Sequence, residues 1–308
     1  MAEFSAADAA FTGFRVVWER PWAVAIWAGL QIVVNVALKV FIAASAGAAM
    51  AQIAQLGMPA PNANPAQMLA LMRQVAPTYV VLMIVGLIVS AVFYAAMNRA
   101  VMRPQESRFG YLRLAADELR QLGLVVTLVL VFLALEVTAA IIWLVLLALF
   151  GMALGANSTV GVGLLVLMLT PATLCVFIFV GVRLSLASPL TFVSGRIDLA
   201  GSWRLTRGRF WPLLGAYCIA TALNLVVILL IFVIAQLAVG ILSGGLAQGA
   251  AVMQVQPTSV AAALTPAQLT YLVILSIGAA LSAPITTCPP AAIYKALTGG
   301  GAIGKVFD

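Results

Sequence analysis

The sequence predicts an all-α integral membrane protein with six transmembrane helices, and composition and long apolar runs carry this prediction. Hydrophobic residues make up 64% of the 308 residues and charged residues only 8%, whereas soluble domains average roughly 25% charged residues. Several uninterrupted apolar runs exceed the roughly 18 residues that indicate a membrane span. A β-barrel would instead show segments of about 10 residues with alternating polarity. Residues 1–308 are therefore interpreted as a single transmembrane domain.

Six apolar runs provide the expected spans. They lie at residues 22–46, 78–98, 122–150, 162–187, 211–242 and 269–297. The first run is much longer than the roughly 7–15 apolar residues of a signal peptide, so we interpret it as an uncleaved span. Consecutive spans are expected to pair as three helical hairpins, at approximately residues 1–98, 107–187 and 196–297.

The basic residues predict the orientation in the membrane. Fourteen of the sixteen Lys and Arg residues lie in the terminal segments and in the connections on one side, whereas the other side carries only Arg73 and one span contains Lys39. Because Lys and Arg concentrate on the cytoplasmic side of membrane proteins, both termini are predicted to be cytoplasmic. The same rule accounts for the net charge of +7 without nucleic-acid binding.

A short basic, amphipathic segment is expected before each hairpin, along the inner membrane surface. FRVVWERPW (14–22) and WRLTRGRFW (203–211) share an aromatic residue, two Arg and a Trp at the same spacing, whereas LRLAADELRQL (112–122) has Glu118 in place of the second Arg. These residues are expected to anchor the topology among the membrane lipids, and the alternative is a specific site for anionic headgroups or for a partner. The interfacial candidates are Arg15, Arg20, Trp22, Arg204, Arg207, Arg209 and Trp211.

Two helix starts have the same pattern. NPAQ (64–67) and TPAQ (265–268) each have a capping residue, then Pro at the first helical position and Gln three residues after the cap. This pattern is typical of a helix that begins with a capping box. Pro77 is expected to interrupt the first of these helices before the second span, so that residues 65–76 form either a short interfacial helix or a kinked extension of the span.

Polar residues inside the spans are the main site candidates, because such groups are rare in membranes and often functional. Gln31, Asn35 and Lys39 recur every fourth residue, so they form one stripe on a helix. Lys39 lies about 26 Å from the start of its span at about 1.5 Å per residue, so its stem can reach the outer surface. The alternative hypothesis pairs Lys39 with Glu136 of the third span.

Span six has an unusual run of prolines, SAPITTCPP (282–290). Pro284 and Pro289, with the adjacent Pro290, are expected to break or kink the helix, and Thr286 and Thr287 to hydrogen-bond the carbonyls that the prolines free. Broken helices often line binding sites in transporters, but a kink that only lets helices pack is the simpler interpretation. A further candidate, Asn224, is expected to join helices within the membrane.

The segment VRLSLASPLTFVSGRIDLAGSWRLTRGRFWPLLGAY (182–217) resembles a bacterial six-span family. That family is named for the membrane domain of some glycerophosphoryl diester phosphodiesterases. The ending PPAAIYKAL (289–297) is similar to the last span of that family. The resemblance implies a fold and a bacterial inner-membrane location, but no phosphodiesterase activity, because catalysis in the fused relatives belongs to a separate soluble domain. The residues that carry the resemblance are Arg183, Pro189, Ser202, Trp203, Leu205, Thr206, Gly208, Arg209, Phe210 and Trp211.

Enzyme chemistry has little support in the sequence. The chain has no His, which removes the commonest general base and metal ligand, and its three Cys are far apart, so no cofactor or metal is expected. Glu106, Asp117, Glu118 and Asp198 are expected to balance nearby Arg. The favoured function is therefore a non-enzymatic accessory, scaffolding or envelope-maintenance protein. The alternative is a transporter, channel or lipid-handling protein with a polar site near Glu136, Lys39 and span six. The sequence does not show whether the chain binds a protein partner or a second copy of itself.

Overall fold

The computed structural model describes all residues except 1–4, 57–63, 155–158, 255–256 and 300–308. Among the described residues the regular structure is entirely helical. The elements are α1 (Ala6–Glu19), α2 (Pro21–Ser45), α3 (Gly47–Leu56), α4 (Pro65–Met102), η1 (Arg108–Tyr111), α5 (Ala116–Leu154), α6 (Thr159–Leu184), α7 (Ala187–Ser194), α8 (Leu199–Thr206), α9 (Phe210–Ser243), α10 (Leu246–Gln254), α11 (Val260–Ala263) and α12 (Pro266–Thr298).

Six of the described helical segments are long and apolar enough to cross a membrane, as predicted. They contain α2, α4, α5, α6, α9 and α12, and at most 28% of the residues in their most apolar parts are buried within the chain. Apolar side chains on the outside suit a chain surrounded by lipid, because acyl chains are as apolar as a protein interior. The structure thus confirms the helical membrane-protein class.

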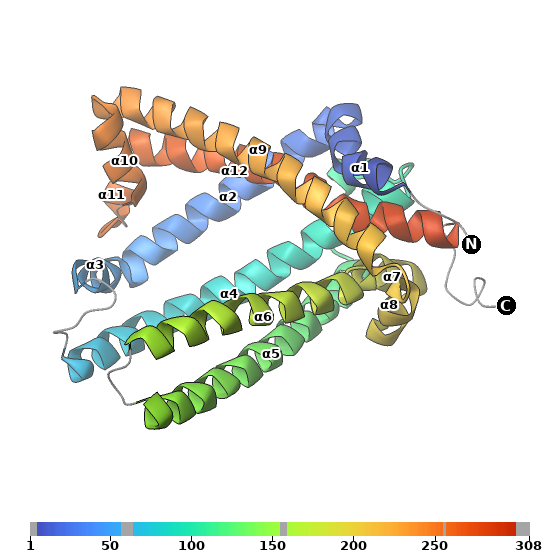
Figure 1. Ribbon diagram of the computed structural model, residues 1–308. Coiled ribbons are helices and arrows are strands. Elements are labelled where there is room, and N and C mark those ends of the chain that lie inside the picture. The colour runs from blue at the N-terminus through green and yellow to red at the C-terminus, as the bar shows by residue number, and fades with distance from the viewer. Residues whose placement is uncertain (1–4, 57–63, 155–158, 255–256, 300–308) are drawn as a thin grey trace.

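The long helices form two groups, which we call the first group (α2, α9 and α12) and the second group (α4, α5 and α6). Figure 1 shows that the groups meet near α1, α7 and α8 and separate toward their other ends. Helix α12 packs against α9 and α2, α4 packs against α5, and α12 also contacts α4 where the groups meet. The termini of the described chain lie at the same end as this junction.

The main apolar core lies at the junction. It includes Val16 of α1, Trp27 of α2, Met97 of α4, Tyr111 of η1 and Cys288 of α12, all buried. These residues come from both groups and from the two segments that precede α2 and α5. Packing at one end therefore holds the two groups together.

The predicted pairing into three hairpins is not confirmed. Helices α9 and α12 pack along each other, and α5 packs on α6, but α2 and α4 belong to different groups and make few contacts. Separate helices α1 and α8 precede α2 and α9, as expected for the interfacial segments. In the middle segment, most of residues 112–122 belong to the first turns of α5 rather than to a helix of its own.

Two helices continue through prolines that were expected to interrupt them. Helix α4 starts at Pro65 and passes through Pro77, and α12 passes through Pro284, Pro289 and Pro290, so a break is wrong in both helices and a continuous helix, the other prediction, is what the structure has. A break in a membrane span would leave backbone N–H and C=O groups without water to bond to, so a proline-containing span stays helical where neighbouring helices pack against it. The predicted starts are correct. Asn64 accepts from the Ala66 amide at 3.0 Å, whereas the side chain of Thr265 makes no capping bond.

Candidate functional site

A crevice lies between the two helix groups near their junction. It consists of two adjoining cavities of about 250 and 220 Å³, which share Tyr94, Thr286 and Thr287 as lining residues. Helices α4 and α12 therefore form walls of both cavities. Leu124, Val125, Leu128 and Phe132 of α5, with Gly181 and Leu184 of α6 and Pro290 of α12, make one wall of the larger cavity largely apolar. Gln31 of α2, with Val89, Ser90 and Phe93 of α4 and Ala283 of α12, completes the smaller one.

The proline-rich part of α12 gives the crevice polar oxygens. The hydroxyls of Thr286 and Thr287 donate to the Ala283 carbonyl at 3.2 and 2.6 Å. Pro290 has no N–H to offer the Thr286 carbonyl one turn earlier. The two hydroxyls were expected to serve the carbonyls that the prolines free, but they donate within the turn before. Their remaining lone pairs accept hydrogen bonds at the crevice wall.

Three further lining side chains have hydrogen-bonding capacity to spare. Within the described part of the chain, nothing hydrogen-bonds to the side chains of Gln31, Ser90 or Tyr94. Gln31 and Ser90 are half-buried, and Tyr94 is 37% exposed. Gln31 belongs to α2 of the first group, and Ser90 and Tyr94 belong to α4 of the second group. A polar molecule in the crevice would therefore contact both groups at once.

The other polar lining residues have partners that fix the wall. Ser188 of α7 accepts from the Asn98 amide at 2.8 Å and donates to Gln121 at 3.0 Å. Ser185 accepts from the Tyr217 hydroxyl at 2.7 Å. Asn98 and Gln121 are buried, so these bonds join α4, α5 and α7 in an apolar setting where unpaired amides are costly.

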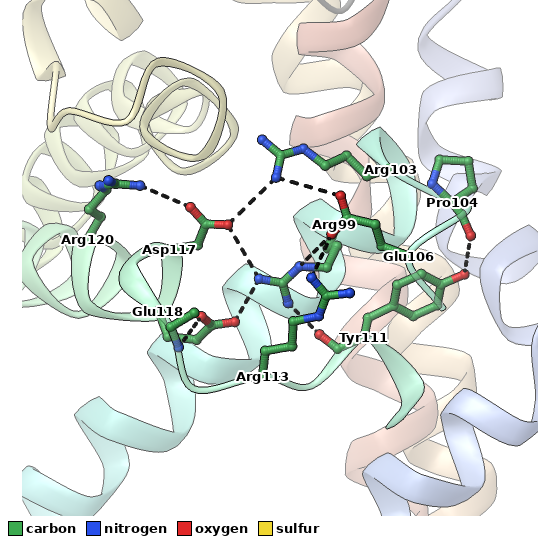
Figure 2. A network of polar contacts seen from close by, with 10 residues as sticks. Arg99, Arg103, Pro104, Glu106, Tyr111, Arg113, Asp117, Glu118 and Arg120 are labelled. Carbon is green, nitrogen blue, oxygen red and sulfur yellow. Dashed lines mark hydrogen bonds and ion pairs between the residues drawn. The ribbon is translucent and has the colours of Figure 1, made fainter. Parts of the chain in front are cut away.

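A buried ion cluster supports the base of α4 and α5 (Figure 2). Arg99 is 1% exposed, and its Nη2 lies 2.8 Å from Glu118 and 3.5 Å from Asp117. Its Nε lies 3.8 Å from Glu106, and its Nη1 donates to the Tyr111 carbonyl. A buried guanidinium is tolerated only with such partners. The expected balance of these carboxylates by Arg is confirmed.

Exposed arginines complete the cluster at its rim (Figure 2). Arg113 lies 3.0 Å from Glu106, and Arg103 and Arg120 lie 3.7 and 3.1 Å from Asp117. Every carboxylate of the cluster thus has at least one arginine within ion-pair distance. Among the described residues, no group of three or more Asp, Glu, Cys or His side chains is arranged to hold a metal ion.

A joint between α2 and the segment after α4 holds the two groups at the junction. The indole N–H of Trp27 donates to the Gly110 carbonyl at 2.7 Å. Arg20 donates to the Ala100 carbonyl, and its guanidinium lies 5.0 Å from the centre of the Tyr111 ring. Phe109, Gly110 and Tyr111 all have positive φ angles, of 50°, 63° and 66°, which for the two non-glycine residues is a strained conformation.

The pair between Lys39 and Glu136, which was the alternative hypothesis, does not form. No ion pair joins them in the described structure, where Lys39 is half-buried on α2 and Glu136 is exposed on α5. The two helices belong to different groups, which explains why a similar depth in the membrane does not bring the residues together. Asn35 of the same stripe instead donates to Ser276 of α12 at 2.9 Å.

The remaining span candidates do not line the crevice. Pro284 and Pro289 are buried in the packing of α12. Asn224 is half-buried on α9, and no hydrogen bond reaches its Oδ1 from the described residues. Of the sequence candidates, the crevice therefore brings together Gln31, Thr286 and Thr287.

Some of the interfacial candidates are exposed without a polar partner among the described residues, and others already bond to groups of the protein itself. Trp22, Arg207 and Trp211 are exposed, as lipid contact requires. Arg15 is exposed but donates to the Asp8 carbonyl at 2.8 Å, and Arg204 lies 4.0 Å from Asp198. Arg209 donates to the Leu205 carbonyl at 3.2 Å. With Arg20 in the joint, only part of the set is available to headgroups.

Sequence reasoning missed Ser90 and Tyr94, which line the crevice, and Arg99, which centres the ion cluster. Ser90 and Tyr94 are spaced four residues apart within span two, so they share a helix face. That spacing is the signal that could have found them.

Comparison of the chain with protein-family models, with curated proteins and with solved structures finds no match. The resemblance to the six-span family therefore stays a prediction from its motif.

Proposed function

We propose that this chain is a non-enzymatic, lipid-handling membrane protein that holds a lipid in the crevice between its helix groups. The observation that carries the proposal is the lining of the crevice. Polar side chains from both groups face an apolar wall on α5, which is the pairing of surfaces that a headgroup with an acyl chain requires. A scaffold would need a packed bundle instead, and the groups separate away from the junction.

The proposed setting is the inner membrane of a bacterium, with both termini in the cytoplasm. The concentration of Arg near the junction supports this orientation, because Lys and Arg mark cytoplasmic segments. In that orientation the exposed Trp22, Arg207 and Trp211 lie at headgroup level on the cytoplasmic side. The crevice then belongs to the cytoplasmic half of the membrane.

Photocrosslinking tests whether a lipid occupies the crevice. Leu128 lines the larger cavity, whereas Leu130 of the same helix is 58% exposed and does not line it. Each is replaced in turn by benzoylphenylalanine, and the purified protein is exchanged into lipid-free detergent before illumination. We expect a lipid adduct at residue 128 and none at residue 130. Absence of the adduct at 128 would favour the scaffolding function.

A further inference from the structure

The lining of the crevice contains no charged side chain among the described residues, although charged groups are concentrated close by. We propose that the crevice selects a lipid whose headgroup is uncharged and carries hydroxyls, in preference to an anionic phospholipid. This inference rests on the proposed function and adds the class of ligand to it. Three features of the site carry it: its hydrogen-bonding groups, the absence of a cation, and its apolar wall.

The hydrogen-bonding groups favour a ligand that brings its own donors. Thr286 and Thr287 already donate to the Ala283 carbonyl, so their hydroxyls can only accept from a ligand. A headgroup hydroxyl donates to these oxygens and also accepts from the hydroxyl of Tyr94 or Ser90. A phosphate diester has only acceptor oxygens and would face the threonine lone pairs without a donor.

Nearby arginines are already engaged. Arg99 is buried against Glu118, and Arg20 donates to the Ala100 carbonyl beside the ring of Tyr111. Neither lines the crevice. An anionic headgroup placed there would lose water without gaining a partner charge, and an unpaired charge is expensive in an apolar setting.

The arginine next to the crevice wall does not line it. Arg183 directly precedes Leu184, which lines the larger cavity. Its guanidinium lies 5.1 Å from the Phe179 ring and 5.4 Å from the Trp203 ring, which hold it by cation–π contact. Arg183 itself is not among the lining residues. The choice of headgroup thus depends on the neutral side chains that remain.

The apolar wall accounts for the rest of the ligand. Leu124, Leu128 and Phe132 recur at helical spacing on α5 and line the cavity that contains Thr287 and Tyr94. An acyl chain along this wall keeps the headgroup beside the hydroxyls. The apolar wall contacts the acyl chain of the lipid and not its headgroup. Substitution of the polar lining residues should therefore alter the choice among headgroups more than the total amount of lipid bound.

The test measures lipid competition on the full-length protein in detergent by native mass spectrometry. The probes are dioleoylglycerol, its monoglucoside and dioleoyl phosphatidylglycerol at equal mole fractions. We expect the two uncharged lipids to be bound at least about tenfold more than phosphatidylglycerol, because the phosphate of the anion would lose water in the crevice without gaining a partner cation. Equal or preferred binding of phosphatidylglycerol overturns the inference.

Variants assign the preference to the crevice. Tyr94→Phe and Gln31→Leu are each expected to reduce binding of the monoglucoside about fivefold and to leave phosphatidylglycerol unchanged. Tyr79→Phe is the control, because Tyr79 lies on the same helix, is 55% exposed and does not line the crevice. An unchanged monoglucoside affinity in Tyr94→Phe and Gln31→Leu would contradict the assignment.

A gain-of-function variant separates the two proposals. Ser90→Arg places a guanidinium in the smaller cavity and should reverse the preference toward phosphatidylglycerol. If it does not fold, Ser90→Ala should still lower monoglucoside binding about fivefold. Binding of no lipid by the wild-type chain refutes the proposed function itself. Binding without headgroup preference, or without a response to either Ser90 variant, refutes only the selectivity.

Discussion

Arg99 and Glu118 form a buried ion pair at the base of α4 and α5, with 2.8 Å between Nη2 and Oε1 and side chains that are 1% and 5% exposed. The second carboxylate oxygen of Glu118 accepts from the Ala115 amide at 3.0 Å, at the start of α5. One carboxylate thus neutralises a buried charge and also caps a helix that is long and apolar enough to cross a membrane.

Glu118→Gln should destabilise the protein by about 3 kcal/mol, because it leaves the Arg99 charge buried with only the more distant Asp117 and Glu106. The measurement is unfolding in detergent, followed by circular dichroism. Arg113→Gln is the control, since Arg113 is 43% exposed and such a pair contributes at most about 1 kcal/mol. Equal losses in the two variants would show that burial does not control this cluster.

Gly13→Ala should loosen the packing of α1 on α12. A Cβ at Gly13 would lie 2.3 Å from the Pro284 carbonyl oxygen and 2.4 Å from the Ile285 Cα, so backbone must move at a cost of about 1–3 kcal/mol. A Cβ at Gly29 of α2 meets nothing within 4 Å. Gly29→Ala should therefore leave the unfolding midpoint unchanged or raise it, and a similar loss in both variants would contradict the close contact.

Trp27→Phe tests the joint at the junction. The variant keeps an aromatic ring in a fully buried position but removes the donor to the Gly110 carbonyl, at a cost of about 1–3 kcal/mol. Trp22→Phe provides the comparison, because Trp22 is 82% exposed. We expect a lower unfolding midpoint only for Trp27→Phe, and faster proteolysis near Gly110 in the folded variant. Unchanged stability would mean that the hydrogen bond does not hold the joint.

Lys39 and Glu136 should behave as independent residues. Because they lie in different helix groups and form no ion pair in the described structure, the effects of Lys39→Met and Glu136→Gln on unfolding free energy should add within about 0.5 kcal/mol. The double variant measures this sum directly. A coupling above about 1 kcal/mol would reveal a pair, either in another conformation of the chain or between two copies.

The helices were predictable because length and apolarity alone define a membrane span. The starts at Pro65 and Pro266 were also predictable, since Pro at the first helical turn gives up no hydrogen bond. The balance of Glu106 and Asp117 by Arg followed from the excess of Arg around them. These predictions depend on local sequence or on composition, and neither requires knowledge of which helices meet.

The grouping of helices was not predictable, and its cause is physical. In a soluble protein the apolar face of a helix marks its buried side, but in lipid the exposed side is apolar too. Leu128 in the crevice and the exposed Leu130 are therefore the same residue type on one helix. Similar depth made Lys39 and Glu136 plausible partners, but depth does not distinguish neighbouring helices from distant ones. The role of Tyr94 likewise depends on which helix faces α4.

The separation of the two helix groups away from their junction gives the proposed lipid a route to the crevice from the side. A lipid that approaches sideways from the bilayer never has to dissolve in water, and its supply depends on its mole fraction in that leaflet. Occupancy would then follow membrane composition, and a scarce lipid would have to compete with every abundant neighbour at the same opening. A crevice between helix groups that meet at one end would in this way sample the bilayer around it.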